Sequence, residues 1–269
     1  MLFRSVDNGA AGDAYTGLEM AQNSQRKYVL YATDFTQNRV EMFNGSFKPI
    51  GTFTDPSVTS IEPSFGAWSV QALNGKLYVT FASLANSHGG VVDVFDTDGN
   101  LLTPQHFAAN AFDAGPLENP WGIIQAPANF GAYSNDLLIG NVAGAGNISV
   151  FDPATGAYLG QLDRPDGTPI ATTGLWDLEF GDGKPHGGKT NQLFFDAGPN
   201  APGVSINGLF GAIQPAGHHG HKGGHDSSPE VAARSHPMLH TLTARQLRPV
   251  VQHALADRQS AEVTEARWR

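Results

Sequence analysis

The chain contains no cysteine, so disulfides, thiol chemistry and cysteine-ligated metal sites are all excluded. Charged residues are also few, at 15% of the 269 residues, and solubility must therefore depend on uncharged polar side chains. No run of about 18 apolar residues occurs, which predicts that the chain has no membrane span. Residues 1–7 have no apolar stretch of the length that export requires, and we therefore expect no signal peptide in this chain.

Basic residues are scarce over most of the chain. Residues 1–213 hold nine Lys and Arg against 20 Asp and Glu, whereas residues 214–269 hold seven against five. Binding to nucleic acid depends on a basic face that neutralises phosphates. The acidic main part therefore predicts no nucleic-acid partner, and leaves an unknown protein or small molecule as the expected partner.

What the chain does have is an internal repeat. Trp68, Trp121 and Trp176 each precede a short apolar run, at spacings of 53 and 55 residues, and Thr16 stands in the same place 52 residues before Trp68. A later run in each repeat closes on a phenylalanine, at spacings of 52, 56 and 59 residues: Phe43, Phe95, Phe151 and Phe210. Two landmarks that keep nearly one period indicate a repeat architecture.

Each repeat holds short runs rich in β-branched and aromatic residues. Residues 92–95, Val-Asp-Val-Phe, alternate in the way that is typical of a strand. In the first repeat the runs at 28–34 and 39–43 predict strands, and in the second repeat a fourth strand is expected from Leu101 onward. Asn44-Gly45 and residues 97–100 provide hairpin turns. Four strands per repeat predict an all-β fold, a β-propeller of four-stranded blades that is part of a larger, six-bladed type. About four blades are visible, over residues 15–55, 65–109, 119–163 and 174–213; a β-sandwich with coincidental periodicity is the alternative.

The end of the chain differs from the predicted propeller, which we assign to residues 1–213. Residues 214–236 are rich in His and Gly and predict a linker, because such a segment cannot form a core. Residues 237–269 predict a short helical segment, since apolar residues between 247 and 255 follow a helical stripe. Four linker imidazoles are candidates for opportunistic binding of Zn²⁺, Cu²⁺ or Ni²⁺: His218, His219, His221 and His225.

Six motifs in order connect the chain to a known family. They are residues 6–18, 74–80, 92–102, 119–123, 151–156 and 174–178. Together they resemble an uncharacterised bacterial family of exported NHL-like propellers, many of which end in a PEP-CTERM sorting signal. The resemblance covers about residues 2–213 and implies a propeller fold and an extracellular or cell-surface location. It also implies further blades before Val6, so that this chain looks like an N-terminally truncated member, and the PEP-CTERM ending is absent.

The mouth of the central channel is the expected ligand site. In a propeller, the loops that enter the innermost strands share one face with the loops between the second and third strands. The candidate ligand-binding residues on these loops are Asp34, Glu62, His88, Asn119, Asn141 and Asp196. Carboxylate and amide oxygens that converge on one axis suit Ca²⁺, which is the one cofactor that this pattern suggests.

Two classes of function remain open from the sequence. The first is a non-catalytic scaffold that binds a ligand or a protein. The second is a metal-assisted lactonase or an enzyme similar to the streptogramin lyases, with His88 or His186 at the channel mouth. No Gly-x-Ser-x-Gly elbow, phosphate loop or His-Glu-x-x-His motif occurs, so no residue is assigned as catalytic.

The repeated tryptophans are predicted to pack between blades, because buried aromatic rings stabilise such contacts. Trp121 in particular is expected to be largely buried beside Ile139 or Phe151. Residues 2–7 are expected to form a short outer strand, and the last repeat is expected to lack its fourth strand. The four blades are therefore predicted to form an open arc with apolar end faces, and the chain to be poorly soluble or oligomeric.

Overall fold

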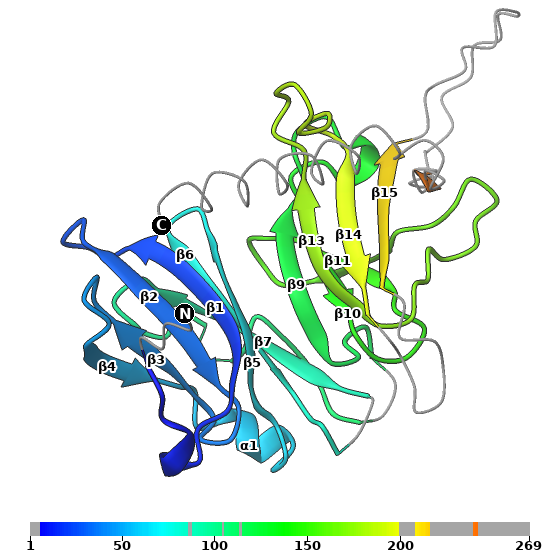
Figure 1. Cartoon of the computed structure of the whole chain (residues 1–269). Helices are drawn as coiled ribbons and strands as arrows, with labels where there is room; N and C mark the ends of the chain where they lie inside the picture. Colours follow the sequence, from blue (N-terminus) through cyan, green and yellow to red (C-terminus); the bar gives the residue numbers. More distant parts are fainter. Residues whose placement is uncertain are drawn as a thin grey trace, which may run out of the picture.

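The computed structural model describes residues 6–85, 88–103, 105–112, 115–198 and 208–215, together with the backbone of residues 239–241. Four sheets of four antiparallel strands make up this part of the protein (Figure 1). In each sheet the strands lie in chain order, so every strand pairs with the one that precedes it in the sequence. The predicted all-β fold of four-stranded blades is confirmed.

The strands of the first two sheets have these bounds: β1 (Tyr15–Gln22), β2 (Tyr28–Asp34), β3 (Arg39–Phe43), β4 (Pro49–Phe53), β5 (Gly66–Leu73), β6 (Lys76–Ala82), β7 (Gly90–Asp96) and β8 (Ala108–Asn110). The strands of the last two sheets are β9 (Pro120–Gln125), β10 (Leu137–Asn141), β11 (Ile148–Phe151), β12 (Tyr158–Gln161), β13 (Leu175–Phe180), β14 (Leu193–Ala197), β15 (Leu209–Pro215) and β16 (Leu239–Thr241). Helical structure within the described residues is confined to α1 (Val58–Ile61), η1 (Gly9–Ala11) and η2 (Gly131–Tyr133).

The first strand of each sheet is the innermost one. β1 contacts β5, β5 contacts β9, and β9 contacts β13, so successive sheets meet along their first strands. The later strands then lead outward, as Figure 1 shows for β2 to β4 beside β1. This arrangement is that of consecutive propeller blades.

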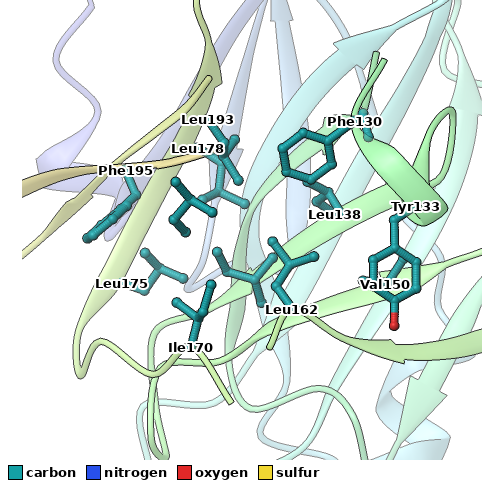
Figure 2. Packing of buried hydrophobic residues seen from close by; sticks show 13 residues of the cluster. Phe130, Tyr133, Leu138, Val150, Leu162, Ile170, Leu175, Leu178, Leu193 and Phe195 are labelled. Atoms are coloured by element: carbon teal, nitrogen blue, oxygen red, sulfur yellow. The ribbon is translucent and has the colours of Figure 1, made fainter. Parts of the chain in front are cut away.

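Three apolar clusters hold neighbouring sheets together, because alternate side chains of each strand point to opposite faces. The cluster between the third and fourth sheets includes Phe130, Leu138, Leu178 and Phe195, all nearly inaccessible to solvent (Figure 2). Comparable clusters join the first sheet to the second and the second to the third. Burial of one such side chain contributes roughly 1.5–3 kcal/mol, so these clusters fix the relative placement of the blades.

A β-bulge stands near the start of every inner strand. The pairing register shifts at Thr16 in β1, at Trp68 in β5, at Trp121 in β9 and at Trp176 in β13. A bulge leaves an extra residue out of the strand ladder and turns its side chain aside. The repeated position that the sequence identified is therefore the bulge of each blade.

The bulge explains why one prediction about Trp121 is wrong. Trp121 is only half-buried, and it is Ile123, two residues further on, that packs in the cluster with Ile139 and Phe151. Because the bulge interrupts the alternation of faces, the apolar position shifts from the tryptophan to the residue after the bulge. Trp68 is buried as predicted, with 7% of its surface exposed.

Strand bounds from the sequence agree best for the middle strands. Residues 28–34 and 39–43 are strands with the predicted bounds, whereas the fourth strand of the second sheet begins at Ala108 and not at Leu101. The fourth place in the last sheet is held by β16, which pairs with Ile213 to Pro215 of β15. The sequence analysis missed this strand because it assigned residues 237–269 to a helical segment.

Several predictions concern residues outside the described part. These are the rest of the linker after Pro215, including His218, His219, His221 and His225, and the helix expected after Thr241. Val6 and Asp7 are not in a strand, and the remainder of the expected strand at 2–7 is also outside the described residues. Within the described part, no helix is long and apolar enough to span a membrane.

The outer faces of the first and last sheets carry exposed apolar side chains. Leu18 and Met20 of β1 are 67% and 60% exposed, and Leu209 and Phe210 of β15 are 51% and 45% exposed. These faces agree with the expected apolar ends of an arc. The closure of the ring and the oligomeric state stay predictions.

Candidate functional site

Asn119 and Asn141 position the loops that lead into the third sheet. The Asn119 side-chain amide donates to the Ser83 carbonyl at 3.0 Å. The Asn141 carbonyl oxygen accepts from the Glu118 amide at 2.9 Å, and its NH₂ group donates to the Pro116 carbonyl at 3.1 Å. Both side chains are nearly buried, so they hold backbone in place and present little polar surface to a ligand.

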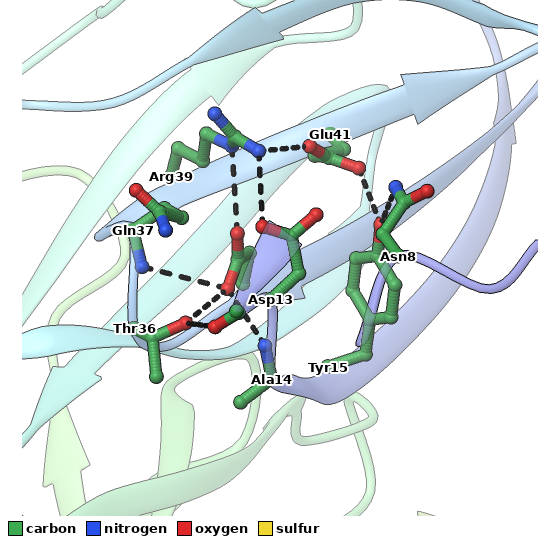
Figure 3. Close-up of polar contacts among 10 residues, drawn as sticks. Asn8, Asp13, Ala14, Tyr15, Thr36, Gln37, Arg39 and Glu41 are labelled. Carbon is green, nitrogen blue, oxygen red and sulfur yellow. Dashed lines mark hydrogen bonds and ion pairs between the residues drawn. The ribbon is translucent and has the colours of Figure 1, made fainter. Parts of the chain in front are cut away.

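An ion-pair network in the first sheet joins Arg39 to Asp13 and Glu41 (Figure 3), and Asp34 is also part of it. The Asp34 carboxylate accepts from the Ala14 amide and from the Thr36 hydroxyl, both at 3.0 Å. Arg39 is its direct partner across the β2–β3 hairpin, and the Arg39 Nε lies 3.5 Å from Asp34 Oδ2. The guanidinium also contacts Asp13 at 3.4 Å and Glu41 at 2.5 Å.

Without Arg39, this network of carboxylates would be a candidate site for a metal cation. Asp13, Asp34 and Glu41 bring three carboxylates close enough to share an ion. Burial and the charges of Asp34 and Glu41 raise the pKa of Asp13, and burial together with a hydrogen bond to Glu41 raises the pKa of the Tyr15 hydroxyl. The Arg39 guanidinium supplies the positive charge that these carboxylates need, so the first sheet gives no support to the predicted Ca²⁺ site.

Glu62 and His88 lie with Asn119 in a second polar region, on the loops of the second and third sheets. Glu62 accepts from the Ser64 hydroxyl at 3.1 Å, and this hydroxyl lies 2.8 Å from the Ser83 hydroxyl. His88 Nδ1 lies 3.2 Å from a Glu118 carboxylate oxygen. The predicted residues Glu62, His88, Asn119 and Asn141 are thus brought together, through Ser83 and Glu118.

Asp196 belongs to a different place, the last sheet. Its carboxylate accepts from the Asp177 amide at 2.8 Å, at the bulge of β13. It lines an open hollow of about 570 Å³, which we call the last-sheet hollow: Trp176, Asp196, Ala197, Gly198, Gly208, Leu209 and Phe210. A hollow of this size with mostly apolar walls and one carboxylate is typical of a small-ligand site.

Two further carboxylates lie beside the last-sheet hollow. Asp177 and Glu179 line an adjoining hollow of about 250 Å³ that shares Asp196 and Phe210 with it. Burial, followed by repulsion from Asp196 and Glu19, raises the pKa of Asp177. Burial, followed by repulsion from Asp177 and Glu19, raises the pKa of Glu179. Within the described residues, no salt bridge to a basic side chain offsets this charge.

A row of aromatic rings crosses the sheets and ends at this hollow. Phe35 packs edge-on against Trp68 with ring centroids 5.3 Å apart, Trp68 against Trp121 at 5.1 Å, and Trp121 against Trp176 at 4.9 Å. Each tryptophan comes from the bulge of its own inner strand. Trp176 is the last ring of the row and lines the last-sheet hollow, where it remains half-exposed.

The sequence analysis missed Arg39, Glu118, Asp177 and Glu179. A signal for Asp177 was present, because the residue after the repeated bulge position is Gly17, Ser69 or Gly122 in the other blades and is charged only in the last one. Asp34 and Arg39 flank a tight hairpin, which could have predicted their pairing.

No family model matches the chain. Two curated relatives are the uncharacterized proteins R648 and L690 of Acanthamoeba polyphaga mimivirus, with 28% and 29% identity over 197 and 211 residues. These matches cover 69% and 74% of this chain, and 45% and 51% of the relatives. The chain therefore spans about half the length of the curated relatives it matches. Both relatives are viral, and the resemblance to bacterial PEP-CTERM proteins stays a prediction.

Solved structures with a similar arrangement include a streptogramin B lyase, with 11% identity, a TM-score of 0.41, and coverage of 67% of this chain and 47% of that one. An exo-β-1,3-galactanase from Phanerochaete chrysosporium has 13% identity and a TM-score of 0.49, with 73% and 46% covered. The calcium-binding protein regucalcin from Agrobacterium tumefaciens has 14% identity and a TM-score of 0.33, with 65% and 66% covered. These likenesses are too weak to assign an activity.

Proposed function

We propose that this protein is a non-catalytic β-propeller scaffold, exported or held at a cell surface, that binds a cationic ligand in the last-sheet hollow. The observation that carries this proposal is the combination of Trp176 with the carboxylates of Asp177, Glu179 and Asp196 around one concave surface. The location rests on the family resemblance alone, and fractionation of cells that produce the protein tests it separately.

Charge selects the ligand class. The raised pKa values of Asp177 and Glu179 mean that their charged forms are disfavoured where they stand. An ammonium or guanidinium group in the hollow removes this repulsion, and the face of an aromatic ring adds a cation–π attraction of about 0.5–1 kcal/mol at an exposed site. A basic peptide segment carries such groups in series, and is the partner that we favour.

The test is a calorimetric titration with a short lysine-rich peptide, with a glutamate-rich peptide of the same length as comparison. We expect the lysine-rich peptide alone to bind, with an affinity that falls as salt is added. Replacing Asp177 and Asp196 together by Asn is expected to weaken binding by about tenfold or more, because a charge-assisted contact contributes about 1.5–3 kcal/mol.

The matched control is the double variant Asp152→Asn, Asp166→Asn. Both of these carboxylates are exposed and accept hydrogen bonds from their own turns in the third blade. Equal loss of affinity in the control variant would mean that only the overall acidity of the chain matters, and would remove the hollow from the proposal.

A second candidate function rests on the pair formed by His88 and Glu118. The imidazole is half-exposed beside a carboxylate, at 3.2 Å, which is an arrangement that can orient a general base. We propose it as the basis of the alternative function, a metal-assisted lactonase or a lyase. Lactone hydrolysis by the natural chain that is lost in His88→Gln would establish that function. Failure of the natural chain to bind the lysine-rich peptide would, in addition, remove the first.

A further inference from the structure

A histidine and two carboxylates meet at the outer boundary between the first and second sheets, away from the residues discussed so far. Asp55 follows β4 of the first sheet, Asp93 is in the middle of β7, and His106 precedes β8 of the second sheet. The pairing of β7 with the segment before β8 brings Asp93 and His106 together, and the contact between the sheets adds Asp55.

The distances among these side chains suit a small metal ion. His106 Nδ1 lies 2.8 Å from Asp93 Oδ1 and 3.6 Å from Asp55 Oδ2. One nitrogen and two oxygens, one from each residue, lie within 4.8 Å of one another. Ligands bound at about 2.0–2.2 Å to a tetrahedral Zn²⁺ lie roughly 3.4 Å apart, and the two distances from His106 Nδ1 lie on either side of this value.

Burial makes this cluster costly without a positive charge. Asp55 and Asp93 are 3% and 0% exposed, and each keeps one buried carboxylate oxygen, Oδ2, without a hydrogen-bond partner. Asp55 Oδ2 lies 3.6 Å from His106 Nδ1, the same nitrogen that Asp93 contacts. Buried carboxylates that converge in this way require either a shared proton or a cation.

A further residue holds the ligands in place. The Ser57 hydroxyl donates to Asp55 Oδ1 at 2.6 Å and lies 3.3 Å from His106 Nε2. If Nδ1 of His106 binds a metal, Nε2 carries the proton and donates a hydrogen bond to the Ser57 hydroxyl oxygen. A second hydrogen bond of this kind fixes the orientation of nearly every metal-bound histidine.

We propose that Asp55, Asp93 and His106 bind a Zn²⁺ ion that joins the first sheet to the second, with Ser57 as the residue that orients two of the ligands. One nitrogen and two carboxylate oxygens are a ligand set that Zn²⁺ accepts. The ion is structural, because it connects two sheets at their outer edge and lies outside both hollows of the last sheet.

The other carboxylate cluster of the protein provides an internal comparison. Asp13, Asp34 and Glu41 also converge, but Arg39 lies among them and supplies the positive charge. Within the described residues, the cluster of Asp55 and Asp93 has only His106 in this role, and one imidazole carries at most one positive charge for two carboxylates. This difference is why we assign the metal to the second cluster alone.

The test uses the full chain with all seven histidines beyond residue 213 replaced by Ala, so that they cannot bind the added metal. In this background we expect one equivalent of Zn²⁺ to bind and to raise Tm. Asp93→Asn and His106→Gln are each expected to abolish the Zn²⁺-dependent rise in Tm. Ser57→Ala is expected to weaken binding by about tenfold, the size of effect found for residues that orient metal ligands.

The matched control is Asp166→Asn, which makes the same change of a carboxylate to an amide at an exposed residue that accepts hydrogen bonds from its own turn. It is expected to keep the full response to Zn²⁺. Asp93→Asn retains the shape of the side chain and removes a buried charge, so we expect it to fold, and circular dichroism without metal checks this. An unchanged response to Zn²⁺ in both Asp93→Asn and His106→Gln, or no binding at micromolar Zn²⁺, would overturn the proposal and leave a proton shared between the carboxyl groups.

Discussion

Removing the buried tryptophan of the second sheet should destabilise the protein more than removing its half-buried neighbour. Trp68 is 7% exposed and packs edge-on against both Phe35 and Trp121. Replacement of a buried Trp by Ala costs about 3–5 kcal/mol. Trp121 buries a smaller part of its ring, so we expect Trp121→Ala to cost roughly half as much.

The contact between the two rings should appear as a coupling energy. An edge-on aromatic pair contributes about 0.5–1.5 kcal/mol beyond the area that it buries. In a double-mutant cycle, the free energy of unfolding lost in the double variant (Trp68→Ala with Trp121→Ala) should therefore differ by about this amount from the sum of the losses in the two single variants. Trp68 and Trp176 are connected only through Trp121 in the aromatic row, so their cycle is the matched control and should be additive within about 0.5 kcal/mol.

The assay is equilibrium unfolding in urea followed by far-ultraviolet circular dichroism, because the substitutions alter tryptophan fluorescence. The denaturant dependence should stay constant across the variants, as required for a comparison of free energies. If Trp121→Ala costs as much as Trp68→Ala, or if both cycles show the same coupling, the inference that the bulge places Trp121 partly outside the blade interface is refuted.

Three other outcomes follow from the structure. Arg39→Met should lower the free energy of unfolding by about 1–3 kcal/mol, because Asp13, Asp34 and Glu41 lose their shared cation. The control Lys184→Met breaks an exposed ion pair with Asp182, and in the same urea assay it should change the free energy of unfolding by less than about 1 kcal/mol. Gly146→Ala should destabilise the protein more than Gly167→Ala. Both glycines have a positive φ, but only at Gly146 would an added Cβ collide with a carbonyl group, that of Thr172. Equal Tm values for the two variants would contradict this. The pKa of Asp177 is raised in the folded protein, so the protonated carboxyl stabilises the fold at low pH and this contribution is lost as the pH rises. From about pH 4 upward, Tm should therefore fall less in Asp177→Asn than in the natural chain.

The arrangement of strands could be predicted from the sequence because it depends on local patterns. Alternation of apolar residues and the turn sequences between runs placed β2 and β3 at their observed bounds. The common spacing of the tryptophans identified one equivalent position in every blade, and the structure shows that this position is a bulge. β8 and β16 were misplaced because they are three residues long and are defined by pairing with β7 and β15.

The candidate sites could be predicted only in part. The sequence placed Glu62, His88, Asn119 and Asn141 on loops of one face, and the structure joins them through Ser83 and Glu118. The sequence could not show that Asp34 is paired with Arg39, or that Asp196 lies apart from the other predicted residues, near Asp177 in the last sheet.

The sequence by itself therefore determined the repeat, the strands and the face on which the loops gather, since each follows from spacing along the chain. Only the tertiary structure decided which charges are compensated. Asp34 meets a guanidinium, while Asp55, Asp93 and His106 meet across two sheets with two carboxylate oxygens left without a partner. The physical reason is that burial and charge compensation depend on distances between residues of different strands and sheets, and a pattern along one chain does not contain these distances.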